Sequence, residues 1–400
     1  MLRSILSITI IIVLLSSCSS SLSPVKPPKS LTKIDNAFKI NKIWSFKINE
    51  GASDKYLKLS PVLDGDILYN VDHRGMITAI RITDRNVLWE TNIGREIGSP
   101  LTLSGNKLYL GTSDGQVIAL NKEDGQQLWS VDVSSEVLSA PAVGKGYVIV
   151  RCVNGELFAL KSQNGEKVWK DRQIIPSLTL RGTSAPVIYN DVVLSAFDNG
   201  KLLAYNLQTG RILWERSIAE ARGRSTLERL VDIDAELVVS DDIIYAVAFQ
   251  GKVAAIAVAS GQVIWSRDFD SYIGMAVDPY RIYIVDSNSE MLALDKSNGA
   301  THWKQDALLR RSVTRPLLHS NYVLLGDLNG FIHWFRRDTG QLVARVKIDS
   351  FDSTNPSLDE EEDLKYPKSR DILTAPVTKE NVVIALDRHG NAEAFEISYP

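Results

Sequence analysis

The stretch Ser99–Trp129, SPLTLSGNKLYLGTSDGQVIALNKEDGQQLW, decides the fold of this chain. It reads as four short strands separated by three turns, two of which are Ser113–Gly115 and Glu123–Gly125. The Asp-Gly pairs in these turns supply the positive φ that tight hairpins require. The stretch therefore predicts a small antiparallel sheet, and its recurrence about every 40 residues predicts a repeat architecture.

Copies of this stretch fill the chain from residue 61 onward. They open at a proline or its counterpart, at Pro61, Pro100, Pro141, Pro186, Glu236, Ala276, Pro316 and Pro376. Six of them end in a tryptophan, at Trp89, Trp129, Trp169, Trp214, Trp265 and Trp303. The seventh ends at Leu342–Ala344 without one, and Trp334 falls outside the pattern. We expect the recurring indole to wedge between neighbouring units as core packing.

The two ends of the repeat region complete one another. The eighth copy, Pro376–Ile397, holds three strands instead of four, whereas Lys42–Ile48 is an orphan strand around Trp44 with no copy before it. Pairing of the N-terminal strand into the last unit explains both facts. The sequence therefore predicts an all-β fold over residues 38–400, an eight-bladed β-propeller with four antiparallel strands per blade that closes in this way.

The first residues resemble the leader of a bacterial lipoprotein. The apolar run Ile5–Leu15 is too short to span a bilayer and suits a signal peptide. It ends in Leu15-Ser-Ser-Cys18, which resembles the lipobox, whose cysteine thiol receives a diacylglycerol. We therefore expect a signal peptide over residues 1–17, lipidation of Cys18 and a flexible tether over residues 18–37. The alternative is an ordinary secretory signal with a chance cysteine.

Ser19 follows the lipidated position, where an aspartate would favour inner-membrane retention in the sorting rule that this leader resembles. We therefore expect an anchor on the periplasmic face of the outer membrane. The net charge of −3 gives no attraction to nucleic acid. Cys18 and Cys152 are the two cysteines, and lipidation of the first leaves no intramolecular disulfide. Cys152 is expected to be a small buried hydrophobe.

The connections between copies locate a candidate site, because function on a ring of repeats lies where the repeat is broken. Trp169–Pro186 and Trp214–Glu236 are long and adjacent. Alignment of the copies places charged and apolar residues of both connections together at the rim of the pore: Leu178, Leu180, Arg181, Asp232 and Asp234. They form either a structural salt-bridge cluster, worth about 0–1 kcal/mol when exposed, or a partner surface of apolar anchors with a charged rim.

A third long connection, Ala344–Pro376, is acidic at Asp359–Asp363. It lacks the alternating ligands and the turn glycine of a calcium loop, so a solvated loop is favoured. The five histidines show no metal-binding or catalytic-triad spacing. We therefore expect no catalytic residue, no metal and no cofactor.

The lipobox, the eight repeats, Leu178–Gly182 and Asp232–Asp234 together resemble the BamB family, lipoprotein subunits of the bacterial outer-membrane β-barrel assembly (BAM) machinery. The resemblance implies a non-catalytic scaffold that helps β-barrel proteins to fold and insert. It also implies that Leu178, Leu180, Arg181, Asp232 and Asp234 contact the periplasmic POTRA domains of BamA, the barrel subunit. Other BAM subunits are then partners as well. Unfolded clients are a further possible partner, by strand addition to a blade edge, although no sequence feature selects this.

Two other interpretations compete with the scaffold. Endings such as Gly261–Trp265 also resemble quinoprotein alcohol dehydrogenases, which are eight-bladed and hold a calcium-bound quinone at the ring centre. The chain has neither the adjacent cysteines nor an evident acidic constellation for that metal. A sugar-binding propeller would carry exposed aromatic residues in its long connections, where Tyr56, Phe351 and Tyr366 are too scattered.

Overall fold

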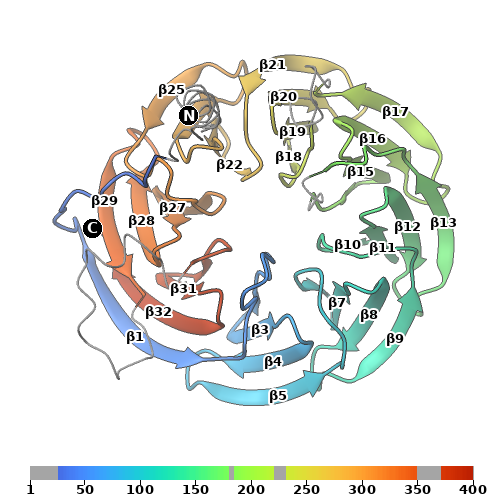
Figure 1. The fold of residues 1–400 in the computed structure, drawn as a ribbon, viewed down its shortest axis with the longest axis horizontal. Helices are drawn as coiled ribbons and strands as arrows, with labels where there is room; N and C mark the ends of the chain where they lie inside the picture. The colour runs from blue at the N-terminus through green and yellow to red at the C-terminus, as the bar shows by residue number, and fades with distance from the viewer. Residues whose placement is uncertain (1–25, 180–183, 220–230, 349–370, 400) are drawn as a thin grey trace, which may run out of the picture.

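The computed structural model describes residues 26–179, 184–219, 231–348 and 371–399. Their strands form eight separate four-stranded antiparallel sheets, which stand as blades around a central axis (Figure 1). The predicted eight-bladed β-propeller is thus confirmed. Within the described ranges no helix is long and apolar enough to cross a membrane.

We number the blades along the chain, so that blade 1 begins at β2. The first strand of each blade lies nearest the axis and has three residues. These strands are β2 (Val62–Asp64), β6 (Thr102–Ser104), β10 (Ala142–Gly144), β14 (Val187–Tyr189), β18 (Val238–Ser240), β22 (Met275–Val277), β26 (Leu317–His319) and β30 (Val377–Lys379). The second strands have five residues and are β3 (Ile67–Val71), β7 (Lys107–Gly111), β11 (Tyr147–Arg151), β15 (Val192–Ala196), β19 (Ile243–Val247), β23 (Arg281–Val285), β27 (Tyr322–Gly326) and β31 (Val382–Leu386).

The third and fourth strands lie toward the outside of the ring. The third strands are β4 (Met76–Arg81), β8 (Gln116–Asn121), β12 (Glu156–Lys161), β16 (Lys201–Asn206), β20 (Gly251–Ala257), β24 (Met291–Asp295), β28 (Phe331–Arg336) and β32 (Asn391–Ser398). The outer strands are β5 (Asn86–Asn92), β9 (Gln127–Asp132), β13 (Lys167–Arg172), β17 (Ile212–Ser217), β21 (Val263–Phe269), β25 (Thr301–Gln305), β29 (Leu342–Lys347) and β1 (Lys39–Lys47).

Strand β1 closes the ring as the sequence predicts. It pairs antiparallel with β32, with Lys39 opposite Ser398 and Lys47 opposite Asn391, and so becomes the outer strand of blade 8. The middle strands of a blade are buried on both faces because neighbouring blades cover them, which explains their continuous apolar runs. Cys152 follows β11 directly and is buried in the apolar core between blades 2 and 3, as expected.

The recurring tryptophan joins each blade to the next. Trp214 of blade 4 donates its indole N–H to the carbonyl of Val258 in blade 5 at 2.8 Å, and its ring covers Gly261. A Cβ added to Gly261 would lie 2.6 Å from that ring. The same contact recurs at five more junctions, at 2.8–3.2 Å, from Trp89, Trp129, Trp169, Trp265 and Trp303 to the carbonyls of Lys122, Ser162, Leu207, Lys296 and Arg337. The indole therefore packs between blades, as predicted.

Blade 7 lacks the terminal tryptophan because two residues have exchanged places. In blade 4, Trp214 on the outer strand lies opposite Ala204 on the third strand. In blade 7, Trp334 is on the third strand and Ala344 lies opposite it on the outer strand. The cross-strand pair is kept, but the indole is now fully buried and donates to the hydroxyl of Tyr399 at 3.3 Å, where the two ends of the chain meet.

A glycine substitution tests the junction contact. Gly261→Ala should lower the free energy of unfolding by about 3 kcal/mol, because the left-handed backbone costs about 1–2 kcal/mol and the overlap with Trp214 adds about 1–3 kcal/mol. Gly105→Ala is the matched control: its φ of +60° is close to the +67° of Gly261, but no atom lies within 4 Å of the added Cβ. It should lose only about 1 kcal/mol in denaturant titrations. Equal losses would contradict the proposed role of the indole.

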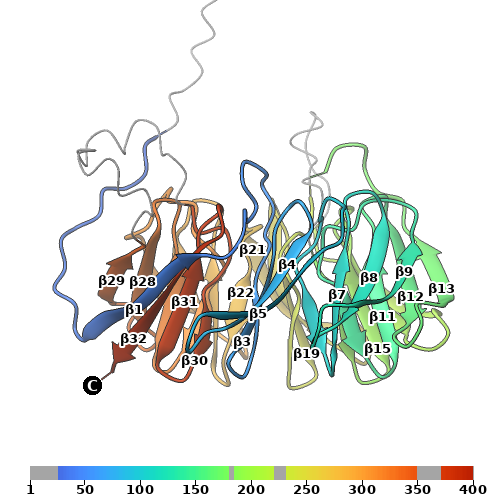
Figure 2. The ribbon, with the colours of Figure 1, turned by 90° about the horizontal axis from the view of Figure 1, so that it is seen from below.

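The segment before β1 lies against the ring. Residues 26–38, dark blue in Figures 1 and 2, pass over blade 7 before the chain enters blade 8. Lys29 N donates to Leu309 O, and Ala37 N donates to Val343 O, both at 2.9 Å. Leu31 packs against the core between blades 6 and 7. The flexible tether expected over residues 18–37 therefore does not extend to residue 37, and residues 29–37 form a docked strap.

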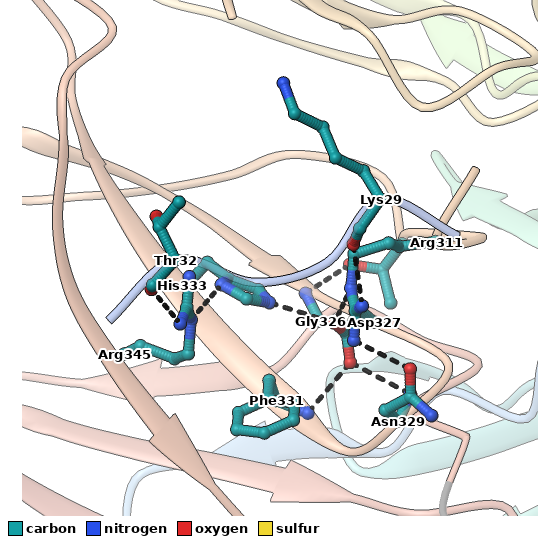
Figure 3. Close-up of polar contacts among 10 residues, drawn as sticks. Lys29, Thr32, Arg311, Gly326, Asp327, Asn329, Phe331, His333 and Arg345 are labelled. Atoms are coloured by element: carbon teal, nitrogen blue, oxygen red, sulfur yellow. Dashed lines mark hydrogen bonds and ion pairs between the residues drawn. The ribbon is translucent and has the colours of Figure 1, made fainter. Parts of the chain in front are cut away.

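Two arginines, one buried and one partly buried, hold the strap (Figure 3). The guanidinium of Arg311 donates to Asp327 Oδ2 at 2.7 Å and to the carbonyl of Lys29 at 3.2 Å. The guanidinium of Arg345 donates to the carbonyl of Thr32 at 3.0 Å. Both arginines therefore link the interior of the blade to the backbone of the strap.

His333 connects the two arginines through Asp327. Its Nε2 lies 3.0 Å from Asp327 Oδ2, and Arg345 Nε lies 3.1 Å from its Nδ1. A guanidinium only donates, so Nδ1 accepts and the imidazole is neutral, with its proton on Nε2 toward Asp327. Burial lowers the pKa of His333, and the charges of Arg345 and Arg311 act in the same direction against the attraction of Asp327.

This arrangement predicts a loss of stability in mild acid. Since the folded protein holds the pKa of His333 below its usual value, the unfolded chain takes up the proton first as the pH falls through about 6.5. Between pH 7 and 5.5, His333 should cost about 1 kcal/mol of the free energy of unfolding. His333→Gln keeps the donor and the acceptor without the titration, so denaturant midpoints of this variant should fall less. The control His302→Gln changes an exposed histidine, and its denaturant midpoints should fall with pH as those of the unmodified protein do. If the midpoints of His333→Gln fell just as much, the assignment would be refuted.

Candidate functional site

The candidate residues are divided between described and masked parts of the chain. Leu178, Asp232 and Asp234 are described. The other predicted positions lie outside the described residues: Leu180, Arg181, the lipidation site Cys18 and the acidic run Asp359–Asp363. The described part of the site lies where blades 3, 4 and 5 meet.

The connection from β13 to β14 presents apolar side chains to solvent. Leu178 is 43% exposed and Ile174 is 91% exposed. The base of the connection is fixed, because Gln173 N donates to Gly155 O at 3.0 Å and Asn199 Nδ2 donates to Ile174 O at 2.9 Å. Ile174 was not among the sequence candidates, although it is apolar in the same long connection as Leu178. Exposed apolar side chains on a fixed loop suit a protein interface.

Asp232 and Asp234 are buried, which differs from the rim position expected from the sequence. Asp232 is fully buried and Asp234 is 7% exposed. Their carboxylates approach that of Asp198, which lies at the start of the turn after β15, and one oxygen of each lies within 4.8 Å of the others. The small free energy of an exposed salt bridge therefore does not apply here, since removing one partner of a buried charge cluster costs several kcal/mol, about 3–5.

Arg151 is the described counter-charge of this cluster. It ends β11 in blade 3 and forms an ion pair with Asp198 in which both side chains are at least 98% buried. Its guanidinium also lies over the ring of Phe197, 5.5 Å from the centroid. Sequence reasoning missed Arg151, although the other second strands end in small or aliphatic residues: Val71, Gly111, Ala196, Val247, Val285, Gly326 and Leu386.

The backbone around the aspartates is held on both sides. Val231, Ile233 and Leu237 pack into the apolar core between blades 4 and 5. Phe249 N donates to Asp232 O at 2.8 Å, and Ser184 Oγ donates to Ala235 O at 3.1 Å. Buried apolar and acidic residues alternate along this segment. This alternation fixes the carboxylates toward Asp198, and it also fixes the exposed loop beside them.

The chemistry of this junction is that of ion pairing. Three clustered carboxylates are the ligand type of hard divalent cations, but here the guanidinium of Arg151 occupies the place beside Asp198. Aspartates and an arginine provide no pair of nucleophile and general base. A rigid charged junction beside exposed apolar side chains is suited to docking another protein.

Comparison with known proteins shows the family to which this chain belongs. A family model described as "Outer membrane protein assembly factor BamB" matches residues 73–305. A relative of that name from Kangiella koreensis is 44% identical over 347 residues, which cover 87% of this chain and 89% of the relative. The chain belongs to the BamB family. The resemblance seen in the sequence is thus confirmed.

Solved structures agree on the fold. The crystal structure of BamB from Moraxella catarrhalis matches with a TM-score of 0.76 at 20% identity and covers 90% of this chain and 100% of that chain. A quinohemoprotein alcohol dehydrogenase from Comamonas testosteroni also matches, with a TM-score of 0.70 at 13% identity, over 92% of this chain and 78% of that chain. At these identities the likeness shows a shared fold, and a shared fold does not carry shared chemistry.

Proposed function

We propose that this protein is a non-catalytic assembly factor for outer-membrane proteins that docks the periplasmic POTRA domains of BamA. One observation carries the proposal: at a single junction of the BamB-family ring, the exposed side chains of Ile174 and Leu178 stand beside buried, ion-paired acidic residues. The apolar side chains provide contact area, and the charged cluster keeps the loops rigid before the partner arrives.

Arg181 completes this site in our proposal. The sequence places it opposite Val231, close to Asp232 and Asp234, whereas Arg151 pairs with Asp198, the third aspartate of the cluster. A second guanidinium close to Asp232 and Asp234 would balance the buried charge and fix the loop that bears Leu180. Loss of that guanidinium would then disorder the docking surface as well as remove a contact.

Membrane attachment follows from the leader. We propose that Cys18 is lipidated and that the anchor holds the ring at the periplasmic face of the outer membrane, together with other BAM subunits. Five outer strands expose an aliphatic residue directly before the tryptophan position, Ile43, Leu128, Val168, Leu213 and Ile264, at 36–50%. This apolar band supports transient contact with unfolded client strands at blade edges.

Binding to the POTRA domains tests the docking proposal. Leu178→Ala should weaken the affinity about tenfold, and Arg181→Glu should weaken it at least about a hundredfold, because it reverses a charge beside buried aspartates. Titration of the purified proteins with the periplasmic part of BamA measures both. The matched controls are Leu213→Ala, an equally exposed leucine at 42%, and Arg211→Glu, an exposed arginine of the same blade. Binding of Leu178→Ala and Arg181→Glu as tight as that of the controls would refute this site.

A further inference from the structure

A cavity of about 310 Å³ lies at the centre of the ring. Its walls come from the connections that lead into seven of the eight blades, represented by Lys58, Leu138, Asp234, Ile273, Arg315 and Thr374. This volume is at the small end of the range for ligand sites and admits one side chain or one small molecule. The cavity is distinct from the exposed loop 173–179.

Lys58 departs from the repeat at a position that faces this cavity. It stands three residues before Pro61, the residue that opens the first copy. In the strand register the same position is aliphatic in three other blades, at Leu138, Val313 and Leu373, and no other described blade has a cation there, since the remaining residues are Gly98, Asp234 and Tyr272. The fold therefore does not require a charge there, and the repeat itself serves as the comparison.

The ammonium group of Lys58 has no partner among the described residues, whether by hydrogen bond or by ion pair. The carboxylates that line the cavity are engaged elsewhere: Glu236 pairs with Arg315 at 3.3 Å, and Asp371 pairs with Arg388 at 3.1 Å. Burial lowers the pKa of Lys58, and the attraction of Asp234 and Glu236 only partly offsets this. An amine that is partly buried without a partner destabilises the fold unless something from outside pairs with it.

A second unpaired donor lines the same cavity. Ser139 is 3% exposed, and its hydroxyl has no hydrogen-bond partner. Native structures rarely leave a buried hydroxyl unsatisfied. Between these polar groups the wall is apolar and aromatic, with Leu138, Ile273 and Tyr272 among its side chains. The cavity thus offers a cation and a donor around an apolar interior.

We propose that this cavity binds a carboxylate borne on a compact apolar or aromatic body, with Lys58 and Ser139 as its donors. A single negative charge matches the single unpaired cation. A phosphate dianion would bring a second negative charge for which the described wall has no free cation, because Arg315 already pairs with Glu236. The same chemistry has two sources, a free small carboxylate or an acidic side chain inserted by a protein partner. The inference does not rest on the docking of BamA.

Lysine-resolved NMR tests the proposal on the full chain. Reductive methylation with ¹³C-formaldehyde labels lysine amines and keeps their charge, and Lys58→Met identifies the signal of Lys58. Phenylacetate and the capped peptide Gly-Gly-Glu-Gly-Gly, each with one carboxylate, are the two probes. At least one should shift the Lys58 signal saturably and raise the pKa of Lys58, whereas the neutral amides, phenylacetamide and the same peptide with glutamine in place of glutamate, should not. The probe that binds more tightly distinguishes a free carboxylate from an inserted side chain.

Calorimetric titration of variants completes the test. Lys58→Met should weaken binding of the better probe at least about tenfold, and Ser139→Ala about threefold. Lys58→Met places an aliphatic side chain where three blades already have one, at Leu138, Val313 and Leu373, so we expect it to fold. Lys55→Met is the matched control, because Lys55 lies on the same connection and pairs with Glu96 at 2.7 Å; it should bind as the unmodified protein does. No saturable shift at about 20 mM of either carboxylate, or an equal response to the neutral amides, would overturn the proposal.

Discussion

The packing of a tryptophan over the last-turn glycine of the next blade is the contact on which the ring depends. It joins sheets that share no strand, and it satisfies the one polar atom of the indole with a backbone carbonyl of the neighbouring blade. The glycine is needed twice, for its left-handed φ and for the room above its Cα. The same contact recurs at the six junctions from blade 1 to blade 7, so these seven blades pack against one another in the same way.

The junctions around blade 8 are packed by different contacts, because the two ends of the chain meet there. Trp334 has moved to the third strand of blade 7, and Phe38, Tyr322 and Tyr399 surround it with ring centroids of neighbours about 5–6 Å apart. The strap over residues 29–37 adds hydrogen bonds to Arg311 and Arg345. Aromatic packing and the docked strap therefore replace the indole–glycine contact where the repeat is interrupted.

The regularity of the ring explains how much the sequence could predict. Blade number, closure by the orphan strand around Trp44 and the place of the recurring indole all follow from a repeat whose period is visible. The burial of Asp232 and Asp234 did not follow, because it depends on Arg151 and Asp198, two positions distant in the sequence from the long connections. Arg151 breaks the repeat at the end of a second strand, so a position-by-position comparison of the copies would have found it, as it finds Lys58. The docked strap has no such signal, since its contacts are made largely by backbone atoms.

The central claim of this account is that BamA docks where the blade connections depart from the repeat, and not on the strands of the ring. Hydrogen–deuterium exchange of the full chain, with and without the periplasmic domains of BamA, tests it directly. The account predicts slower exchange in residues 173–179 and 231–235 on binding, with the outer strands β9, β21 and β25 unchanged. Protection confined to those outer strands, with residues 173–179 exchanging as fast as before, would contradict it.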